Sequence, residues 1–204
     1  MVTVILVRHG ETEWNKLGQI QGGGSNTPLN EKGKQQAEGL ALKLKQERIR
    51  AIYSSRLQRA LDTAQAIARH HQLEVESELS LNEIDAGEME GASIINIGSH
   101  LAQLLIEGEQ GESIFKLHGG ESLAEVQQRA WSTIQRLVDK HRDEVIVVVS
   151  HYFVILTIIS AVLNLPLSQI GRLRLGVGSI STIVFDEQAT RLVLLNDKCH
   201  LTNI

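Results

Sequence analysis

Two short runs of β-branched residues constrain the fold more than any other feature of this sequence. Val2–Val7 and Val145–Val149 are continuous apolar segments with almost no polar interruption. Strands of this kind are buried on both faces, which is typical of a parallel sheet that helices cover on each side. The two runs therefore predict a central parallel sheet between two helical layers.

Amphipathic helices alternate with short strands along the rest of the chain. Asn30 and Ser122 are expected to cap helices, and Ser122 begins a capping box with Glu125. We expect helices over Asn30–Arg48, Leu57–His71, Ser122–Arg142 and from the second run to about Asn164, and further strands over Ala51–Ser54, Leu73–Ser77, Ile180–Phe185 and Leu192–Leu195. This order predicts an α/β fold, a three-layer α/β/α sandwich with a mostly parallel central sheet and right-handed crossovers.

The segment from about residue 91 to residue 119 does not follow this alternation. It contains a modest apolar helix over Ile94–Ile106, followed by a polar stretch with glycine. A length of 204 residues fits one domain, and the two prolines leave no proline-rich linker. We expect a single domain over residues 1–204 with a small inserted helical cap at about 91–119.

Charge and apolar content exclude several classes of protein. The formal net charge is −4, whereas binding to a nucleic-acid backbone generally needs a basic face. The longest apolar run, Tyr152–Leu163, is shorter than the ~18 residues of a membrane span. The N-terminus lacks the pattern of a signal peptide, and the single cysteine, Cys199, suits a reducing compartment. We expect a cytoplasmic protein that binds neither nucleic acid nor membrane.

Polar residues follow the predicted strands where each strand ends. Arg8 and His9 follow the first strand, Arg59 lies one helical turn beyond the second, Glu83 follows the third, and His151 follows the Val145–Val149 strand. Ligands of parallel sheets bind at this carboxyl edge. Each residue alone has an ordinary structural explanation, such as a hydrogen-bonded histidine or a solvated arginine. The convergence of four segments on one edge favours a binding site.

The chemistry of this group points to a phosphorylated ligand. Guanidinium groups of Arg8 and Arg59 match phosphate oxygens bidentately. Neighbouring cations disfavour protonation of His9, which keeps its ring nucleophilic. Glu83 beside a phosphate dianion would have a raised pKa and could move a proton to and from the reacting groups.

Other chemistries find less support in the sequence. The chain contains neither a GxxxxGK[ST] loop nor an HExxH motif. His70 and His71 are adjacent and would point about 100° apart on a helix, so they form a weak metal pair and more simply favour the helix C-terminus. The run Gly22–Gly24 could cradle a phosphate, although glycine-rich turns are common. We expect no metal and no cofactor.

The ten residues Leu6–Asn15, LVRHGETEWN, resemble the signature of the histidine phosphatase superfamily in its phosphoglycerate mutase-like branch. The match continues in order over segments similar to the family's other motifs, at Thr27–Gly33, Tyr53–Ala60, Leu81–Gly91, Gly119–Ser122 and Val148–His151. The resemblance covers nearly the whole chain and is poorest in the cap region.

This resemblance implies roles for the matched positions. His9 would be the nucleophile that becomes phosphohistidine, and Glu83 would be the proton donor and acceptor. The positions expected to bind the phosphoryl group or line its pocket are Arg8, Asn15, Gln21, Gly22, Arg59, His151 and Tyr152.

The chain departs from the family where His151 is followed by Tyr152 and Phe153 instead of two glycines, and where Leu156 replaces a common arginine. Tyr152 keeps its backbone N–H, but two side chains now enter near the pocket. These changes bear on the substrate more than on the chemistry.

The resemblance and the residues together predict a metal-independent phosphomonoester hydrolase that acts on a small phosphorylated metabolite. Two other functions stay open: a phosphoglycerate mutase that uses the same phosphohistidine, and a non-catalytic module that binds a phosphorylated ligand. His118, Arg174 and His200 could contact the non-phosphate end of the substrate or simply lie on the surface. A homodimer is also compatible with the sequence.

Overall fold

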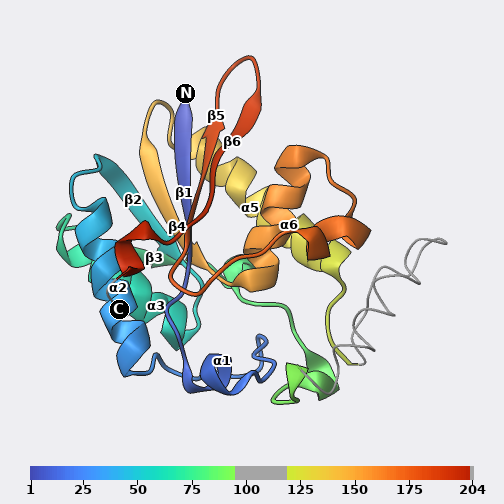
Figure 1. Ribbon diagram of the computed structural model, residues 1–204. Helices are drawn as coiled ribbons and strands as arrows, with labels where there is room; N and C mark the ends of the chain where they lie inside the picture. Colours follow the sequence, from blue (N-terminus) through green and yellow to red (C-terminus); the bar gives the residue numbers. More distant parts are fainter. Residues whose placement is uncertain (95–118, 203–204) are drawn as a thin grey trace.

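The computed structural model describes residues 1–94 and 119–202, and its six strands form one sheet in the order β3-β2-β4-β1-β5-β6 (Figure 1). The strands are β1 (Val2–Arg8), β2 (Ile49–Ser54), β3 (Val75–Ser77), β4 (Val145–Ser150), β5 (Ile180–Phe185) and β6 (Thr190–Asp197). Strands β3, β2, β4 and β1 pair in parallel, whereas β5 is antiparallel to both β1 and β6. The sheet is therefore mostly parallel, as predicted.

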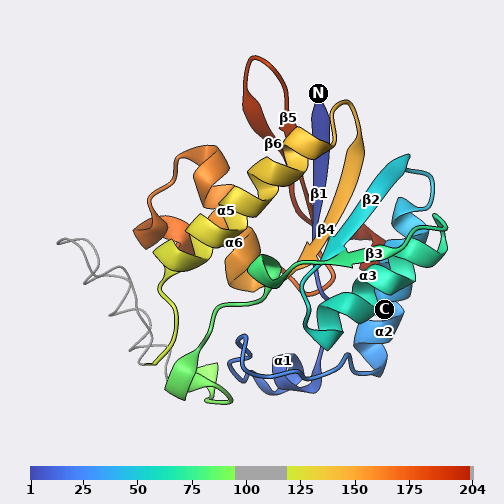
Figure 2. The same ribbon diagram turned by 180° about the vertical axis from the view of Figure 1, so that it is seen from behind.

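Helices cover both faces of this sheet (Figures 1 and 2). The α-helices are α1 (Glu13–Leu17), α2 (Glu31–Leu44), α3 (Gln58–Arg69), α5 (Leu123–Lys140) and α6 (Tyr152–Leu163). Leu6 and Val148 are buried with the apolar sides of α5 and α6, whereas Val7 and Val149 are buried with those of α2 and α3. This alternation along β1 and β4 confirms the three-layer α/β/α sandwich.

Local capping explains where several helices begin and end. The Asn30 side chain accepts the Gly33 N–H at 2.8 Å, and Ser122 and Glu125 form the expected capping box. Helix α2 ends at Leu44, four residues before the predicted end, because β2 already begins at Ile49. Helix α6 ends at Leu163, and Asn164 takes the left-handed conformation that closes many helices.

The register of the sheet brings three strand ends to one place. Arg8 at the end of β1 lies beside Ser150 at the end of β4, and Ser54 at the end of β2 lies beside Val149. The His9 N–H then donates to the Ser150 carbonyl at 3.1 Å. The residues that follow these three strands therefore share the carboxyl edge of the sheet.

Two sequence predictions concern the segment from about residue 91 to residue 119. The helix expected over Ile94–Ile106 lies outside the described residues except for its first position, and the division into one domain with a cap stays a prediction. Within residues 1–94 and 119–202, no helix has both the length and the apolar character needed to cross a membrane.

Candidate active site

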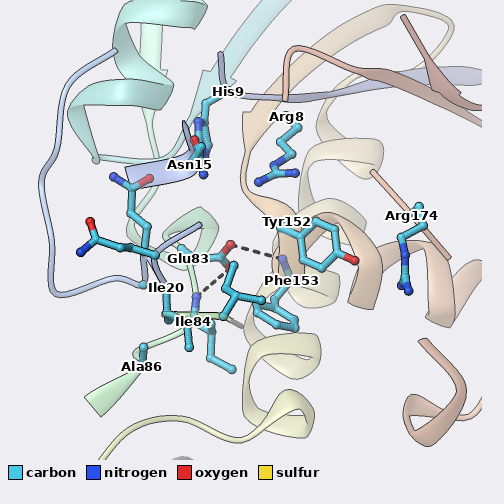
Figure 3. A pocket seen from close by; sticks show the side chains of 14 residues that line it. Arg8, His9, Asn15, Ile20, Glu83, Ile84, Ala86, Tyr152, Phe153 and Arg174 are labelled. Carbon is cyan, nitrogen blue, oxygen red and sulfur yellow. Dashed lines mark hydrogen bonds between the residues drawn. The ribbon is translucent and has the colours of Figure 1, made fainter. Parts of the chain in front are cut away.

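A pocket of about 390 Å³ opens at the carboxyl edge of the sheet (Figure 3). Its polar side carries the four residues Arg8, His9, Asn15 and Glu83. The remaining described residues that line it are Gln19, Ile20, Gln21, Gly22, Ile84, Ala86, Ile94, Tyr152, Phe153 and Arg174. The pocket thus joins a charged end to an apolar wall.

His9 is held as a neutral ring with one free nitrogen. Its side chain is only 3% exposed, and its Nδ1 lies 2.7 Å from the Gly10 carbonyl oxygen. A carbonyl can only accept a hydrogen bond, so Nδ1 carries the proton and the lone pair lies on Nε2. Burial lowers the pKa of His9 well below 6.5, and the charges of Arg59 and Arg8 lower it further. At neutral pH, His9 therefore presents a nucleophilic Nε2.

A close contact between two glycines fixes the chain beside His9. A Cβ atom on Gly10 would lie 2.5 Å from the Gly33 carbonyl oxygen, and one on Gly33 would lie 2.0 Å from the Glu11 carbonyl oxygen. The Gly10 N–H also donates to the Thr63 hydroxyl at 3.2 Å. This close approach needs glycine at both positions and presses the loop after β1 against the first turn of α2.

Arg8 closes one side of the polar end. Its Nη1 donates to the Leu175 carbonyl at 2.6 Å, and its guanidinium carbon lies 5.0 Å from the centroid of the Tyr152 ring. Burial lowers the pKa of Arg8, while the nearby Glu83 and Tyr152 raise it. The ring of Tyr152 therefore packs against a cation that already lies in the pocket.

Arg59 and His151 are fully buried and do not line the described part of the pocket, although both lie near His9. Two N–H groups of Arg59 donate to the carbonyls of Ser25 and Gly22, at 2.9 and 3.0 Å. Burial lowers the pKa of Arg59 to about 10, which leaves it protonated at neutral pH. The His151 ring centroid lies 5.0 Å from that of His9. Burial also lowers the pKa of His151 well below 6.5, with Arg59 as the next largest cause.

Glu83 also lies on the polar side of the pocket and is 5% exposed. Its Oε1 accepts the Ile84 N–H at 2.9 Å and its Oε2 accepts the Phe153 N–H at 3.3 Å (Figure 3). Burial raises the pKa of Glu83, although these two amides and the charges of Arg59 and Arg8 oppose the shift. A raised pKa favours the protonated form of this carboxyl group.

Asn15 and Gln21 turn amide nitrogens toward the same site. The Asn15 Oδ1 accepts the Thr12 N–H at 3.1 Å, so its NH₂ group is left for the pocket. The Gln21 Oε1 lies 2.9 Å from the Thr12 hydroxyl oxygen. Gly22 lines the pocket too, but its N–H donates to Glu90 and its carbonyl accepts from Arg59. Gly22 therefore positions Arg59 rather than offering an amide to a ligand.

Buried side-chain nitrogens without a hydrogen-bond partner concentrate here. Of the six buried side-chain atoms without a hydrogen-bond partner in residues 1–94 and 119–202, four are Arg8 Nε, Gln21 Nε2, Arg59 Nε and His151 Nδ1. Buried polar atoms are nearly always paired in native proteins, so a cluster of exceptions calls for a ligand. A phosphoryl group supplies the acceptor oxygens that the nitrogens of Arg8, Gln21 and Arg59 would need.

The other candidate residues are less closely tied to the site. Arg174 lines the outer part of the pocket and donates to the Gly171 and Leu173 carbonyls. His200 bonds the Gly178 carbonyl at 3.0 Å and does not line the pocket, and His118 lies outside the described residues. In the described part of the chain, no three or more potential metal ligands lie together. His70 and His71 do not belong to such a group.

Several functional contacts have no signal in the sequence. Phe153 was expected only to add bulk, whereas its N–H holds Glu83 from 70 residues away. Ile20 and Ile84 form apolar wall that was not predicted, and Ser55 bonds His151 across 96 residues. The position of Phe153 two residues after a candidate histidine, at the start of a helix, was the one available hint.

Comparison with known proteins agrees with this geometry. The sequence model of the histidine phosphatase superfamily, branch 1, matches residues 4–198 of this chain. Phosphoserine phosphatase 1 of Hydrogenobacter thermophilus is 35% identical over 201 residues, which are 98% of this chain and 95% of that protein. The probable phosphoglycerate mutase GpmB of Salmonella typhi is 33% identical over 92% of this chain and 86% of its own length.

A solved structure extends the agreement to three dimensions. The phosphoserine phosphatase of Entamoeba histolytica, in complex with 3-phosphoglyceric acid, matches with a TM-score of 0.88 and 33% identity, covering 98% of this chain and 100% of that one. Matches of this extent in sequence and in structure show that the chain belongs to branch 1 of the histidine phosphatase superfamily.

Proposed function

We propose that this phosphatase hydrolyses small phosphorylated metabolites without a metal ion, through a phosphohistidine on His9. The observation that carries the proposal is the state of His9, a neutral buried ring with its lone pair on Nε2 and two guanidinium groups nearby. Such a nitrogen is nucleophilic, and the same cations stabilise the charge that develops on a transferring phosphoryl group.

In the first step, His9 Nε2 attacks the phosphorus atom and the ester oxygen leaves. Arg8, Asn15 and Gln21 line the pocket and donate to the phosphoryl oxygens. The buried, unpartnered nitrogens Arg59 Nε and, once protonated, His151 Nδ1 complete this binding. An alkoxide is a poor leaving group and needs a proton as the bond breaks. The raised pKa of Glu83 supports its role as the acid that supplies this proton.

In the second step, water attacks the phosphohistidine and His9 is released. Glu83, now a carboxylate, takes the proton from the attacking water and returns to its starting state. Two displacements at phosphorus replace one difficult hydrolysis, and inorganic phosphate is the second product. All the positive charge that this scheme requires comes from side chains.

The apolar wall and Arg174 bear on the substrate. The organic part of a bound phosphomonoester would lie against Ile20, Ile84 and Phe153, and the Arg174 cation lies on the outer lining. We therefore expect preference for small substrates that carry an anionic group besides the phosphate. The phosphoserine phosphatases among the relatives agree with this class by name.

A phosphoglycerate mutase is the second candidate, because one relative carries that description. Both reactions use the same phosphohistidine and differ in its fate. A mutase must exclude water until the phosphoryl group returns to the bound product, whereas a phosphatase must admit water. Two relatives that each match 98% of the chain are phosphoserine phosphatases by name, which favours hydrolysis.

The test supplies a panel of phosphomonoesters to purified protein in the presence of a chelator. The panel contains phosphoserine, 3-phosphoglycerate and an uncharged alkyl phosphate, and one arm adds a trace of 2,3-bisphosphoglycerate to 3-phosphoglycerate. We expect phosphate release from the anionic substrates to exceed formation of 2-phosphoglycerate by far. Rapid interconversion with negligible phosphate release would establish the mutase instead.

A further inference from the structure

A buried chain of hydrogen bonds runs from His151 to the loop that carries Glu83. His151 Nε2 lies 2.7 Å from the Ser55 hydroxyl oxygen, and this hydroxyl lies 3.0 Å from Asn82 Oδ1. Ser55 and His151 are fully buried. The residues join the ends of β2 and β4 to the segment before Glu83, but neither Ser55 nor Asn82 lines the pocket.

Two backbone amides fix the direction of this chain. The Arg56 N–H donates to Asn82 Oδ1 at 2.9 Å, which settles which end of the Asn82 amide faces Ser55. The Leu57 N–H donates to the Ser55 oxygen at 3.1 Å. Because Asn82 Oδ1 has no hydrogen to give, the single proton of Ser55 must point to it. The Ser55 oxygen is then an acceptor toward both Leu57 and His151.

This direction decides which nitrogen of His151 carries the proton. Ser55 has no second hydrogen, so His151 Nε2 must be the donor of the 2.7 Å bond. The ring is neutral because burial and the charges of Arg59, His9, Arg8 and Arg129 lower the pKa of His151. Its lone pair therefore lies on Nδ1, which is buried and has no partner in the described residues.

We propose that Ser55 and Asn82 are positioning residues that hold His151 in its Nε2–H tautomer, which leaves the lone pair of Nδ1 free. A bound phosphomonoester monoanion gives its proton to this lone pair, and the Nδ1–H then donates to a phosphoryl oxygen. The inference rests on the proposed function for its catalytic consequence, but the tautomer itself is independent of activity. With Nε2 occupied, Nδ1 is the one polar atom of the ring that can serve the reaction. Loss of these hydrogen bonds would let the ring turn or exchange its tautomer. Nδ1 could then no longer take up the proton, and His151 would not gain the positive charge that stabilises the phosphoryl group.

Three substitutions separate the parts of this chain. Ser55→Ala removes the partner of Nε2. Asn82→Leu keeps the Ser55 hydroxyl but frees its proton to turn toward Nε2, which reverses the bond and moves the His151 proton to Nδ1. Ser55→Thr retains the hydroxyl and should restore both the His151 tautomer and kcat. Ser54→Ala is the matched control, because Ser54 is equally buried on the same strand end and its hydroxyl donates to the Ser55 carbonyl rather than to His151 or Asn82.

Long-range proton–nitrogen NMR on histidine-labelled protein reads the tautomer directly, with His151→Gln to assign the signals. We expect a protonated Nε2 in the wild type and in Ser54→Ala, and a shift toward protonated Nδ1 in Asn82→Leu. For a nitrophenyl ester, Ser55→Ala and Asn82→Leu should lower kcat by about 10- to 100-fold with a smaller change in KM, as expected for a misplaced hydrogen bond to a charged group. Ser55→Thr should recover most of this loss.

A protonated Nδ1 in the wild-type protein would overturn the proposal, whatever the activity. So would losses in Ser55→Ala and Asn82→Leu no greater than that of Ser54→Ala at equal thermal stability. If the wild type shows the predicted tautomer but hydrolyses no phosphomonoester, the proposed function fails and the positioning of His151 stands. If Ser55→Ala does not fold, the Asn82→Leu spectrum and its kcat decide the question.

Discussion

Replacement of Glu83 by glutamine tests the acid in the proposed mechanism more selectively than any other single change. The amide keeps the size of the carboxyl group but cannot donate its proton to a leaving oxygen. It also loses one of two backbone hydrogen bonds, and the bond from the Phe153 N–H at 3.3 Å is the weaker of the two. We therefore expect a cost in stability of about 1 kcal/mol and a much larger effect on catalysis.

The size of the catalytic effect should depend on the leaving group. General acids contribute about 10²- to 10⁴-fold, so Glu83→Gln should lower kcat for an alkyl phosphate by that factor. Nitrophenolate leaves without a proton, and kcat for nitrophenyl phosphate should fall less than about tenfold. Burial raises the pKa of Glu83, and the reaction needs the protonated form. Wild-type activity on alkyl phosphates should therefore decline as the pH rises through that pKa. The residual activity of the variant should not show this decline.

The assay follows phosphate release from both substrates between pH 5 and pH 9. Asp85→Asn is the matched control, because Asp85 is an exposed acid on the same loop whose Oδ1 accepts the Gly87 N–H. The control should retain near wild-type kcat on both substrates. Equal losses on alkyl and nitrophenyl phosphates in Glu83→Gln would refute the role of Glu83 as acid and indicate a structural effect instead.

Three further predictions follow from the same structure. Hydrolysis of nitrophenyl phosphate should survive exhaustive chelation, and activity that only Mg²⁺ or Mn²⁺ restores would contradict metal independence. The pKa values of His9 and His151 are lower in the fold than the unfolded value of 6.5. The stability that each neutral ring contributes is therefore fully present above pH 6.5 and is lost as the pH falls below it, by up to about 1.4 kcal/mol per pH unit for each ring. Urea titration at pH 7 and pH 5.5 measures this loss, and equal unfolding free energies would speak against neutral buried rings. Gly33→Ala should cost about 1–3 kcal/mol because its Cβ would meet the Glu11 carbonyl, whereas Gly24→Ala, with no atom nearer than 3.8 Å, should unfold near the wild-type temperature.

Patterns that repeat along the chain allowed much of the fold to be predicted. The β-branched run of β4 and the Ser122 capping box of α5 are local signals, and both elements form where expected. Helix α1 has five residues and no apolar periodicity, so nothing marks it except its Thr12 cap. Helix α2 ends at Leu44 because the next strand begins soon after it. The apolar spacing of the helix gives no information about where that strand begins.

The site could be predicted as far as it depends on the parallel sheet, which places the carboxyl ends of its strands at one edge. His9, Glu83 and His151 follow three different strands, and parallel pairing brings those ends to the same edge of the sheet. The contacts that tune these residues link distant positions, as when Phe153 holds Glu83 or Glu90 binds the Gly22 N–H from 68 residues away. Such contacts depend on how loops pack at the sheet edge, and no local sequence pattern predicts them.

The most direct test of the central claim is to trap the phosphoenzyme. A labelled phosphomonoester is mixed rapidly with the protein, quenched without acid, and the adduct is mapped by peptide analysis. We expect a label that is stable in base, lost in acid and attached to His9, formed at a rate at least equal to kcat, and absent from His9→Ala along with turnover. Turnover by the His9→Ala protein, or an acid-stable label on a serine, would contradict the account.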